Sequence, residues 1–408
     1  MKRVLLSAAV AAAISVPALA APKVNDEASL MQAIAEANNN SEKSRIVFRR
    51  GAHIQLSAPV IYTGSQPLTL IGNGAIVDGT YAGSFELDED LTAVTEEGTL
   101  VFNTAGDLTI KNLSITNSAT RGLVVNIPEN AEGHDMTVRL HKVSVTDSAL
   151  YGVHIDDNAD EFDDGTAGSD IGVELIIRNS EFTGNGTGAI DFDGVRVDER
   201  GLGDIHAEII NTHIDGNGGD GIELDEGGDG DVDATMINVT LNGNGFYNEE
   251  DLDDGFDIDE ADAGDLEVTL IKVQINDNMD EGLDFDEAGE GDLNMMLRRV
   301  DASNNKDEAI KADEEDAGDL EATLKKVVVN NSGDDGIQLT ELGDGEIDAK
   351  FNKVISVNNA KYGIKAEQWV VEDEPTPAET AGTIKSRHVY LDGNEKGDEL
   401  KVNNVVVN

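Results

Sequence analysis

Short runs of alternating apolar and polar residues, separated by glycine, asparagine and aspartate, fill the chain between positions 173 and 359. Leu266 to Leu270, Val273 to Ile275 and Leu283 to Phe285 are three consecutive runs in which every second residue is apolar. Such alternation is typical of β-strands, and none of these runs is long enough for a helix. The pattern therefore predicts a chain of short strands joined by tight turns.

The strands recur in units of 27 residues. Units of this length begin at Ile205, Leu266, Leu293 and Leu320, and the unit that begins at Val232 is longer by an insertion at Phe246 to Leu252. Three short strands cannot bury an apolar face alone, but stacked units share one continuous core. A unit of this size with three strands predicts one coil of an all-β, right-handed parallel β-helix solenoid.

A row of asparagines supports the stacking. If each unit is one coil, these residues share one turn position, with Ser332 in the remaining coil, and their side chains can hydrogen-bond from coil to coil. The row consists of Asn185, Asn217, Asn244, Asn278, Asn305 and Asn359.

The segment before the first strands has helical spacing. Leu30, Ile34 and Ala37 lie on one face of Ser29 to Ala37. An uncovered end of a β-helix would be an edge prone to aggregation. We therefore expect a short helix that caps the N-terminal end of the core.

The opening of the chain also resembles a known fold family. The stretches ASLMQAIAEANNN, RIVFRRGAHIQL and LTLIGNGAIVDG look like the start of the pectate-lyase-like right-handed β-helix superfamily, also called the pectin-lyase fold, in an exported bacterial form. The resemblance covers nearly all of the expected mature chain and implies the fold. Because this superfamily includes lyases, hydrolases, epimerases and adhesins, it does not imply one activity.

The first twenty residues predict a secretory signal peptide, with Lys2 and Arg3 before an apolar stretch and small residues at Ala18 and Ala20. We expect residues 1–20 to be the signal peptide, 21–41 the N-terminal cap with its helix and 42–408 the β-helix. The expected location is the periplasm or the exterior of the cell. No later stretch approaches the length of about 20 apolar residues that a membrane span needs.

Composition and charge narrow the function. The chain has 82 acidic and 29 basic residues, a net charge of −53, and no cysteine. The missing cysteines exclude disulfides, thiolate metal sites and cysteine nucleophiles. The negative charge excludes nucleic acid as a partner and favours cations. Only 4% of residues are aromatic, so few side chains are available to stack on sugars.

The acidic residues occupy fixed places in the third strand of each unit and in the turn after it. We expect them to point outward and to stack in rows, where like charges on neighbouring strands repel. The first row is expected to run His154, Asp191, Glu223, Asp257, Asp284, Lys311 and Gln338, and the second Asp156, Asp193, Asp225, Asp259, Asp286, Asp313 and Thr340.

Divalent cations between the coils would offset this repulsion, because calcium takes six to eight oxygen ligands in flexible geometry. We therefore predict a calcium-binding protein with a structural or surface-binding role and a polysaccharide or cell-surface glycan as a further partner. The alternative, without specific ion binding, is an acidic surface whose charges are screened by salt. The predicted calcium ligands are Asp225, Glu226, Asp231, Asp257, Asp259, Glu260, Asp265, Asp284, Asp286, Glu287, Asp292, Asp313, Glu314 and Asp319.

An enzyme is the second interpretation. The resemblance implies a calcium-dependent polysaccharide lyase or hydrolase that acts on acidic glycans. Such an enzyme would need a basic residue beside the acidic patch, and the candidates are Lys311, Arg298 and Arg299. Against it, the acidic motifs recur in nearly every unit, whereas an active site is usually a local departure from a repeat. Insertions at Asn158 to Ser169, Val195 to Leu202 and Phe246 to Leu252 are expected to be loops that could wall a binding groove.

A thin basic row is also expected. Its residues share one position of the repeat and either pair with acids such as Glu267, Glu321 and Asp348 or track an anionic polymer. The row consists of Lys142, Lys272, Arg299, Lys326 and Lys353.

Overall fold

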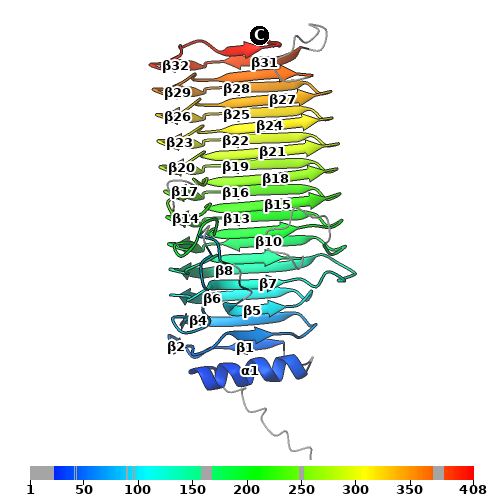
Figure 1. The fold of residues 1–408 in the computed structure, drawn as a ribbon, viewed down its shortest axis with the longest axis vertical. Helices are drawn as coiled ribbons and strands as arrows, with labels where there is room; N and C mark the ends of the chain where they lie inside the picture. The colour runs from blue at the N-terminus through cyan, green and yellow to red at the C-terminus, as the bar shows by residue number, and fades with distance from the viewer. Residues whose placement is uncertain are drawn as a thin grey trace, which may run out of the picture.

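The computed structural model describes residues 23–40, 42, 44–88, 91–93, 95, 97–157, 168–247, 252–370 and 381–408. The expected signal peptide, residues 1–20, lies outside the described residues. The described residues form a tall stack of coils with a helix across one end (Figure 1). No helix among them is long and apolar enough to cross a membrane.

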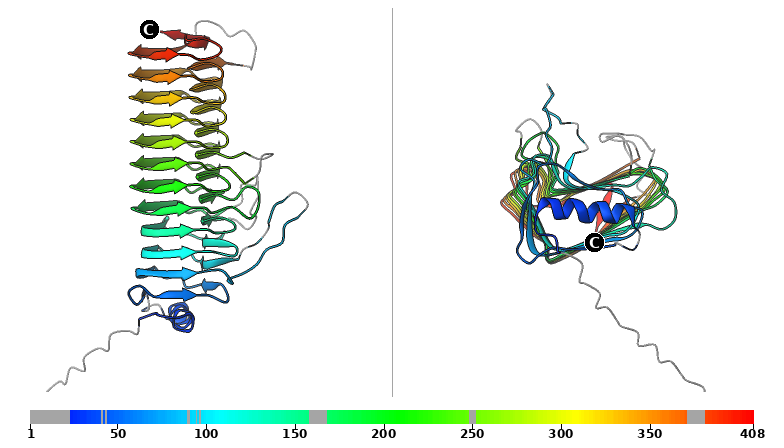
Figure 2. Two further views of the ribbon diagram at one scale, coloured as in Figure 1. Left: turned by 90° about the vertical axis from the view of Figure 1, so that its left-hand side faces the viewer. Right: turned by 90° about the horizontal axis from the view of Figure 1, so that it is seen from below.

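Each strand pairs in parallel with the equivalent strand one coil away. Leu266 lies opposite Leu293 and Leu293 opposite Leu320, so each coil here adds 27 residues. The strands of the stack follow one another in a regular superhelical path, which the side view shows (Figure 2). The fold is the right-handed parallel β-helix that the repeat predicts.

The larger sheet has 22 strands, and in the upper coils it divides into a row of longer strands and a row of three-residue strands. Its strands are β1 (Arg45–Val47), β2 (His53–Gln55), β4 (Leu68–Asp78), β6 (Leu108–Thr116), β8 (Met136–Thr146), β10 (Val173–Arg178), β11 (Glu181–Thr183), β13 (Ile205–Ile210), β14 (His213–Asp215), β16 (Val232–Ile237), β17 (Thr240–Asn242), β19 (Leu266–Ile271), β20 (Gln274–Asn276), β22 (Leu293–Arg298), β23 (Asp301–Ser303), β25 (Leu320–Lys325), β26 (Val328–Asn330), β28 (Ile347–Asn352), β29 (Ile355–Val357), β31 (Gly382–Arg387), β32 (Tyr390–Asp392) and β34 (Val405–Val407).

The smaller sheet has 12 strands and carries ten of the fourteen predicted calcium ligands. Its strands are β3 (Val60–Tyr62), β5 (Gly98–Asn103), β7 (Arg121–Asn126), β9 (Val153–Asp156), β12 (Val195–Glu199), β15 (Ile222–Gly228), β18 (Phe256–Asp262), β21 (Leu283–Gly289), β24 (Lys311–Asp316), β27 (Gln338–Gly343), β30 (Lys365–Trp369) and β33 (Lys401–Asn403).

The predicted cap is confirmed as helix α1 (Glu27–Asn39), which lies across the N-terminal end of the stack (Figures 1 and 2). Asp26 begins the helix as its N-cap, accepting a hydrogen bond of 2.8 Å from the backbone N–H of Ser29. Leu30, Ile34 and Ala37 are the buried residues of the helix, as the spacing predicts. The helix therefore covers the open end of the core.

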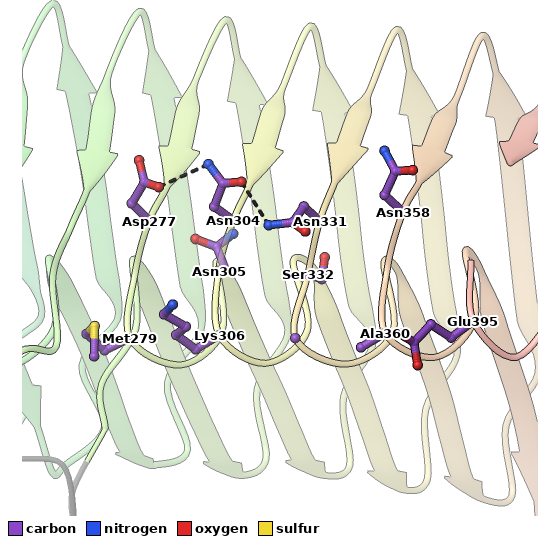
Figure 3. A pocket seen from close by; sticks show the side chains of 11 residues that line it. Asp277, Met279, Asn304, Asn305, Lys306, Asn331, Ser332, Asn358, Ala360 and Glu395 are labelled. Carbon is purple, nitrogen blue, oxygen red and sulfur yellow. Dashed lines mark hydrogen bonds between the residues drawn. The ribbon is translucent and has the colours of Figure 1, made fainter. Parts of the chain in front are cut away.

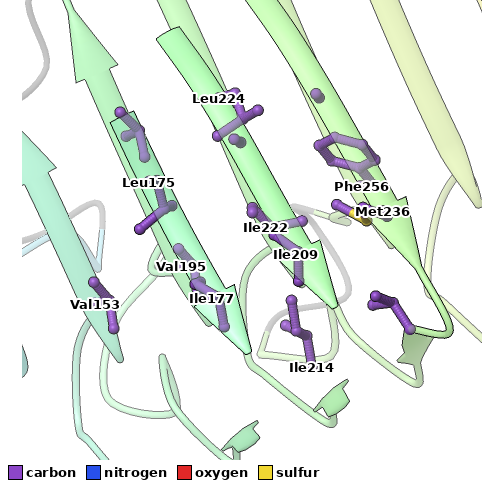
Figure 4. Close-up of a cluster of buried hydrophobic side chains, with 14 of the residues drawn as sticks. Val153, Leu175, Ile177, Val195, Ile209, Ile214, Ile222, Leu224, Met236 and Phe256 are labelled. Carbon is purple, nitrogen blue, oxygen red and sulfur yellow. The ribbon is translucent and has the colours of Figure 1, made fainter. Parts of the chain in front are cut away.

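The core is a column of aliphatic side chains between the two sheets. Ile209 from the larger sheet and Ile222 and Leu224 from the smaller sheet are fully buried and point into the same interior (Figure 4). Because side chains alternate along a strand, about every second residue of each strand faces this interior. Burial of the column offsets the loss of chain entropy that ordering so many short strands requires.

The asparagine ladder is also confirmed. The Nδ2 group of Asn217 donates to Oδ1 of Asn244 at 3.0 Å, and the Nδ2 group of Asn244 donates to Oδ1 of Asn278 at 3.2 Å. All three side chains are fully buried. At Ser332 the backbone N–H still donates to Oδ1 of Asn359, at 3.1 Å, and the ladder goes on to Asn394, which the sequence analysis did not include.

Candidate cation-binding face

The outward side of the smaller sheet carries two rows of polar side chains, called here the outer rows. The register corrects the sequence alignment in one coil: Arg196 and Asp198 of β12, and not Asp191 and Asp193, continue the rows. The first outer row runs His154, Arg196, Glu223, Asp257, Asp284, Lys311 and Gln338, and the second runs Asp156, Asp198, Asp225, Asp259, Asp286, Asp313 and Thr340.

The segment that begins at Val195 was expected to be an inserted loop, which is wrong because Val195–Glu199 is strand β12. Its alternation of apolar and charged residues matches that of Ile222 to Glu226 in the next coil, and this match was the signal that the sequence analysis missed. Most of the other two insertions falls at 158–167 and 248–251, outside the described residues.

The structure separates the predicted calcium ligands into three sets. Those on the outer rows face outward, the glutamates face the interior of the coil, and the remaining aspartates lie in the turn that follows each strand. The outer set is Asp225, Asp257, Asp259, Asp284, Asp286 and Asp313; the interior set is Glu226, Glu260, Glu287 and Glu314; and the turn set is Asp231, Asp265, Asp292 and Asp319.

The outward orientation expected of the glutamates is wrong. Glu226 shares the inward side of β15 with Ile222 and Leu224, as strand alternation requires, and its side chain is fully buried. Glu199, Glu287, Glu314 and Glu341 are fully buried in the same way, as is Glu260 at 1% exposure. Burial raises the pKa of Glu260 to about 10 and that of Glu314 to about 9, and the neighbouring glutamates contribute to both shifts.

The aspartates of the turn set are held by the backbone. Oδ1 of Asp231 accepts a hydrogen bond from the backbone N–H of Asp265 at 2.9 Å, and Oδ1 of Asp265 accepts one from the N–H of Asp292 at 2.9 Å. The same bond recurs from the N–H of Asp319 to Asp292, at 2.9 Å. These exposed carboxylates thus form a structural ladder from coil to coil, which offsets part of their mutual repulsion.

Basic side chains neutralise the outer rows at both ends. At one end Arg196 forms ion pairs with Glu223 and with Asp198, the latter at 2.7 Å. At the other end Nζ of Lys311 lies 2.8 Å from Asp284 and 3.4 Å from Asp286. These contacts leave Asp257 and Asp259, in the coil of β18 between the two ends, without a basic partner among the described residues.

Asp257 and Asp259 occupy this middle coil, and the part of the chain that the structure describes places no Lys, Arg or His within ion-pair distance of either. Asp257 belongs to two groups of carboxylates whose oxygens lie within 4.8 Å of one another, one with Glu223 and Asp259 and one with Asp254 and Asp284. Two ligands of one calcium ion, each at about 2.3 to 2.6 Å, lie no more than about 5 Å apart. Both groups therefore have the dimensions of a calcium site.

The electrostatics of these carboxyls reflect the missing counter-charge. Burial, together with the charges of Asp259 and Asp254, holds the pKa of Asp257 well above its usual value. Burial and neighbouring carboxylates also raise the pKa of Asp259 to about 6 and that of Asp284 to about 7. A bound divalent ion would favour the charged forms and reverse these shifts.

One histidine has a defined environment that its sequence spacing did not reveal. Nε2 of His154 lies 2.7 Å from Oδ2 of Asp198, and Nδ1 lies 3.1 Å from Arg121, while the ring stacks on Tyr151 at 4.5 Å. Burial lowers the pKa of His154 to about 4, so the ring is neutral at pH 7 and lies between the arginine and the aspartate. All four side chains are buried, so this network closes the N-terminal end of the outer rows and presents no open surface.

The basic residues proposed for an enzyme do not adjoin a free acidic patch. Arg298 ends β22, and Arg299 follows it, so both belong to the larger sheet and not to the outer rows. Lys311 does adjoin the outer rows, but the carboxylates of Asp284 and Asp286 outweigh its burial and raise its pKa. It is therefore held as a cation and is unsuited to act as a general base.

The basic row lies at a sharp bend in the larger sheet. Lys272 and Arg299 have positive φ angles of 60° and 61° at this bend, and both are exposed. Asp348, one of the partners expected for this row, pairs instead with Lys350 at 3.2 Å and Lys385 at 3.3 Å. That expected partner is therefore wrong.

A groove of about 590 Å³ runs along the turns that carry the asparagine ladder. Its rim is a second, outer amide row, in which Nδ2 of Asn304 donates to Asp277 at 3.0 Å and Nδ2 of Asn331 donates to Asn304 at 3.1 Å (Figure 3). Lys306 and Met279 lie along the opposite side of the groove (Figure 3). The groove is polar and crosses several coils.

Known proteins resemble this chain in fold. The periplasmic alginate epimerase AlgG aligns with 94% of this chain and 83% of its own at 12% identity and a TM-score of 0.44. The surface protein and adhesin PfbA of Streptococcus pneumoniae aligns with 94% of each chain at 12% identity and a TM-score of 0.33. The catalytic domain of a GH87 α-1,3-glucanase aligns with 95% of this chain and 67% of its own at 10% identity and a TM-score of 0.32. No family model and no curated protein sequence matches the chain.

The raised pKa values predict how stability depends on pH without metal. The folded-state pKa values of Asp259 and Asp284, about 6 and 7, exceed the usual value of 3.8, so the unfolded chain releases these protons first as the pH rises. We therefore expect the free energy of unfolding in excess chelator to fall between about pH 4 and pH 7, by about 1.4 kcal/mol per pH unit for each such group. Urea unfolding at a series of pH values measures it, and Asp259→Asn should reduce the slope. Stability that is constant or rises over this range would contradict the electrostatics described here.

Proposed function

We propose that this protein is an exported β-helix protein that binds calcium on the outer rows of its smaller sheet and uses the bound ions to hold its acidic coils together. The observation that carries the proposal is the middle coil, where Asp257 and Asp259 face neighbouring carboxylates with no basic residue between them. Export follows from the expected signal peptide, which would bring the protein to a compartment where calcium is available.

The pattern of counter-charges supports a cation at this place. The group formed by Asp191, Asp193 and Glu223 has similar dimensions, but Arg196 lies 3.8 Å from both aspartates and already supplies a positive charge. In the two groups around Asp257, Glu223 pairs with Arg196 and Asp284 pairs with Lys311, whereas Asp257 and Asp259 have no basic partner among the described residues. Each repulsive pair at this spacing costs about 1 kcal/mol even in water. A divalent ion bridging β15, β18 and β21 would convert that repulsion into attraction.

Calcium fits these ligands better than other common ions. The groups offer only carboxylate oxygens, which hard cations prefer, and no histidine or cysteine. Calcium accepts irregular geometry, whereas magnesium demands a near-ideal octahedron and gives up its water reluctantly. The rival interpretation, an acidic surface screened by salt, predicts no difference between calcium and other salts at equal ionic strength.

A double variant, Asp257→Asn with Asp259→Asn, separates these interpretations. In excess chelator the variant should unfold at a higher temperature than the wild type, because two repelling charges are removed. In millimolar calcium the wild type should gain about 2.7 kcal/mol for a site at 100 times its dissociation constant, and the variant should gain much less. Thermal unfolding with chelator, calcium or magnesium at fixed ionic strength measures both effects.

Glu321→Gln is the matched control, since Glu321 is an exposed carboxylate on β25 of the larger sheet. It should keep the full calcium response. If calcium stabilised the wild type and the double variant equally, the ions would bind elsewhere. If calcium did not stabilise the wild type, the acidic rows would be a surface screened only by salt.

Glycan binding is the second candidate function, and the groove beside the outer amide row favours it. Asn304 and Asn331 present amides at regular intervals along an open polar channel, and such groups suit the hydroxyls of an extended saccharide (Figure 3). Lys306 adds a positive charge at the same groove.

Lys306→Ala should weaken binding to a carbohydrate array by about tenfold or more if the groove holds a saccharide, since a hydrogen bond to a charged group contributes about 1.5 to 3 kcal/mol. Lys272→Ala removes an exposed lysine at the bend of the larger sheet and should leave the array signal unchanged. Equal losses in the two variants, or no carbohydrate bound by the wild type, would count against the groove.

A further inference from the structure

The buried glutamates form a column along the inside of the smaller sheet, one per coil. Glu226 pairs in register with Glu260, Glu260 with Glu287, Glu287 with Glu314 and Glu314 with Glu341. We call these five residues the inner column. Each side chain is at most 1% exposed. This site is separate from the outer rows, which lie on the opposite side of the same strands.

The middle of the inner column lacks hydrogen-bond donors among the described residues, whereas Glu226 at one end accepts a bond of 3.3 Å from the N–H of Gly230. Both carboxylate oxygens of Glu260, Glu287 and Glu314 are buried without a hydrogen-bond partner in the described structure, as is one oxygen of Glu226 and one of Glu341. The other oxygen of Glu341 accepts a bond of 3.0 Å from the N–H of Gly345. A buried, unpaired carboxylate is too costly to persist, so each must meet a positive charge or take up a proton.

Backbone carbonyls converge on the same space. A Cβ on Gly318 would lie 1.4 Å from the carbonyl oxygen of Gly291 and 2.9 Å from Oε1 of Glu314, and the same arrangement recurs at Gly291 with Gly264 and Glu287. Glycine at these positions therefore lets carbonyl and carboxylate oxygens approach one another. Both kinds of oxygen are acceptors, so neither can satisfy the other.

The C-terminal end of the column shows what the space requires. Gln368 pairs with Glu341 in register and thus continues the column with a neutral amide. Its Nε2 group donates to the carbonyl oxygen of Gly345 at 3.0 Å, and its Oε1 accepts from the N–H of Ile347 at 3.2 Å. The glycine carbonyl therefore accepts a hydrogen bond in the one coil whose column side chain can donate it. In the glutamate coils a bound cation or a proton must take the place of this amide donor.

We propose that the inner column binds dehydrated divalent cations, of which calcium fits best, in the two gaps between Glu260, Glu287 and Glu314. Successive coils are about 4.8 Å apart, which is twice the calcium–oxygen distance of about 2.3 to 2.6 Å, so one ion reaches the carboxylates of both coils. Two divalent ions nearly balance the five negative charges of the inner column. Glycine carbonyls complete the oxygen shell.

Burial gives these ions a distinctive property. Because the inner column has no contact with solvent, its ions enter as the chain folds and leave only when the coils open. Ions on the outer rows exchange without unfolding. The inner column is therefore a structural site, independent of the proposed function of the outer rows.

The test is the metal content of the full mature chain, folded in calcium and then dialysed against excess chelator. We expect about two calcium ions per chain to remain in the folded protein and to be released when urea unfolds it, as measured by elemental mass spectrometry. In Glu287→Gln, whose amide copies Gln368, this retained fraction should be lost, whereas Asp257→Asn with Asp259→Asn should retain it. Circular dichroism confirms that each variant is folded.

Two results would overturn the proposal: a wild type that retains no ion after dialysis, which would mean that protons satisfy the carboxyls, or equal retention in wild type and Glu287→Gln. If Glu287→Gln does not fold, the release rate from the wild type decides. Retained calcium that leaves chelator-treated protein at the rate of global unfolding supports an interior site, and release much faster than unfolding contradicts it. This test does not depend on the proposed function. If calcium still raised the unfolding temperature of Asp257→Asn with Asp259→Asn as much as in the wild type, the retention test would stand unchanged.

Discussion

Stacking in register is the constraint on which the rest of this structure depends. With coils about 4.8 Å apart, each side chain contacts the equivalent side chain of the next coil. A residue type can therefore recur at one position of the repeat only if two copies of its side chain can lie side by side. Asparagine meets this condition by itself, because its amide both donates and accepts, and the buried row from Asn185 to Asn278 forms a continuous ladder. Glycine meets it by allowing close approach. Carboxylates accept hydrogen bonds but do not donate them, and they repel one another. Every acidic row therefore needs hydrogen-bond donors or positive charges from other groups.

The protein supplies these donors and positive charges in different ways along the stack. Aspartates in the turns accept backbone N–H groups of the next coil, as Asp231 does from Asp265. The outer rows receive Arg196 at one end and Lys311 at the other. Two regions receive neither from the described residues: Asp257 and Asp259 on the outside, and Glu260, Glu287 and Glu314 on the inside. These regions lie on opposite sides of the same strands, and a cation is the simplest group that could stabilise both.

The fold was largely predictable from the sequence, and the chemistry of the site only in part. The repeat, the capping helix and the asparagine row followed from spacing alone, because stacking repeats the same contact in every coil. The alternation from Ile222 also implies that Glu226 faces inward, against the general tendency of carboxylates to face solvent. Arg196 was missed because an irregular coil shifted the alignment by five residues, from Asp191 to Arg196. The pairing of Lys311 with Asp284 depends on side-chain conformation, which spacing does not specify.

Divalent cations are proposed to bridge the in-register carboxylates between the positively charged ends of the outer rows, and this bridging can be observed directly. Its most direct test is a crystal structure of the protein grown with calcium, with data collected at a long wavelength where calcium scatters anomalously. We expect an anomalous peak bound by Asp257 together with carboxylates of a neighbouring coil, Glu223 or Asp284. Ordered side chains at these three residues with only water between them, in crystals that contain millimolar calcium, would contradict it.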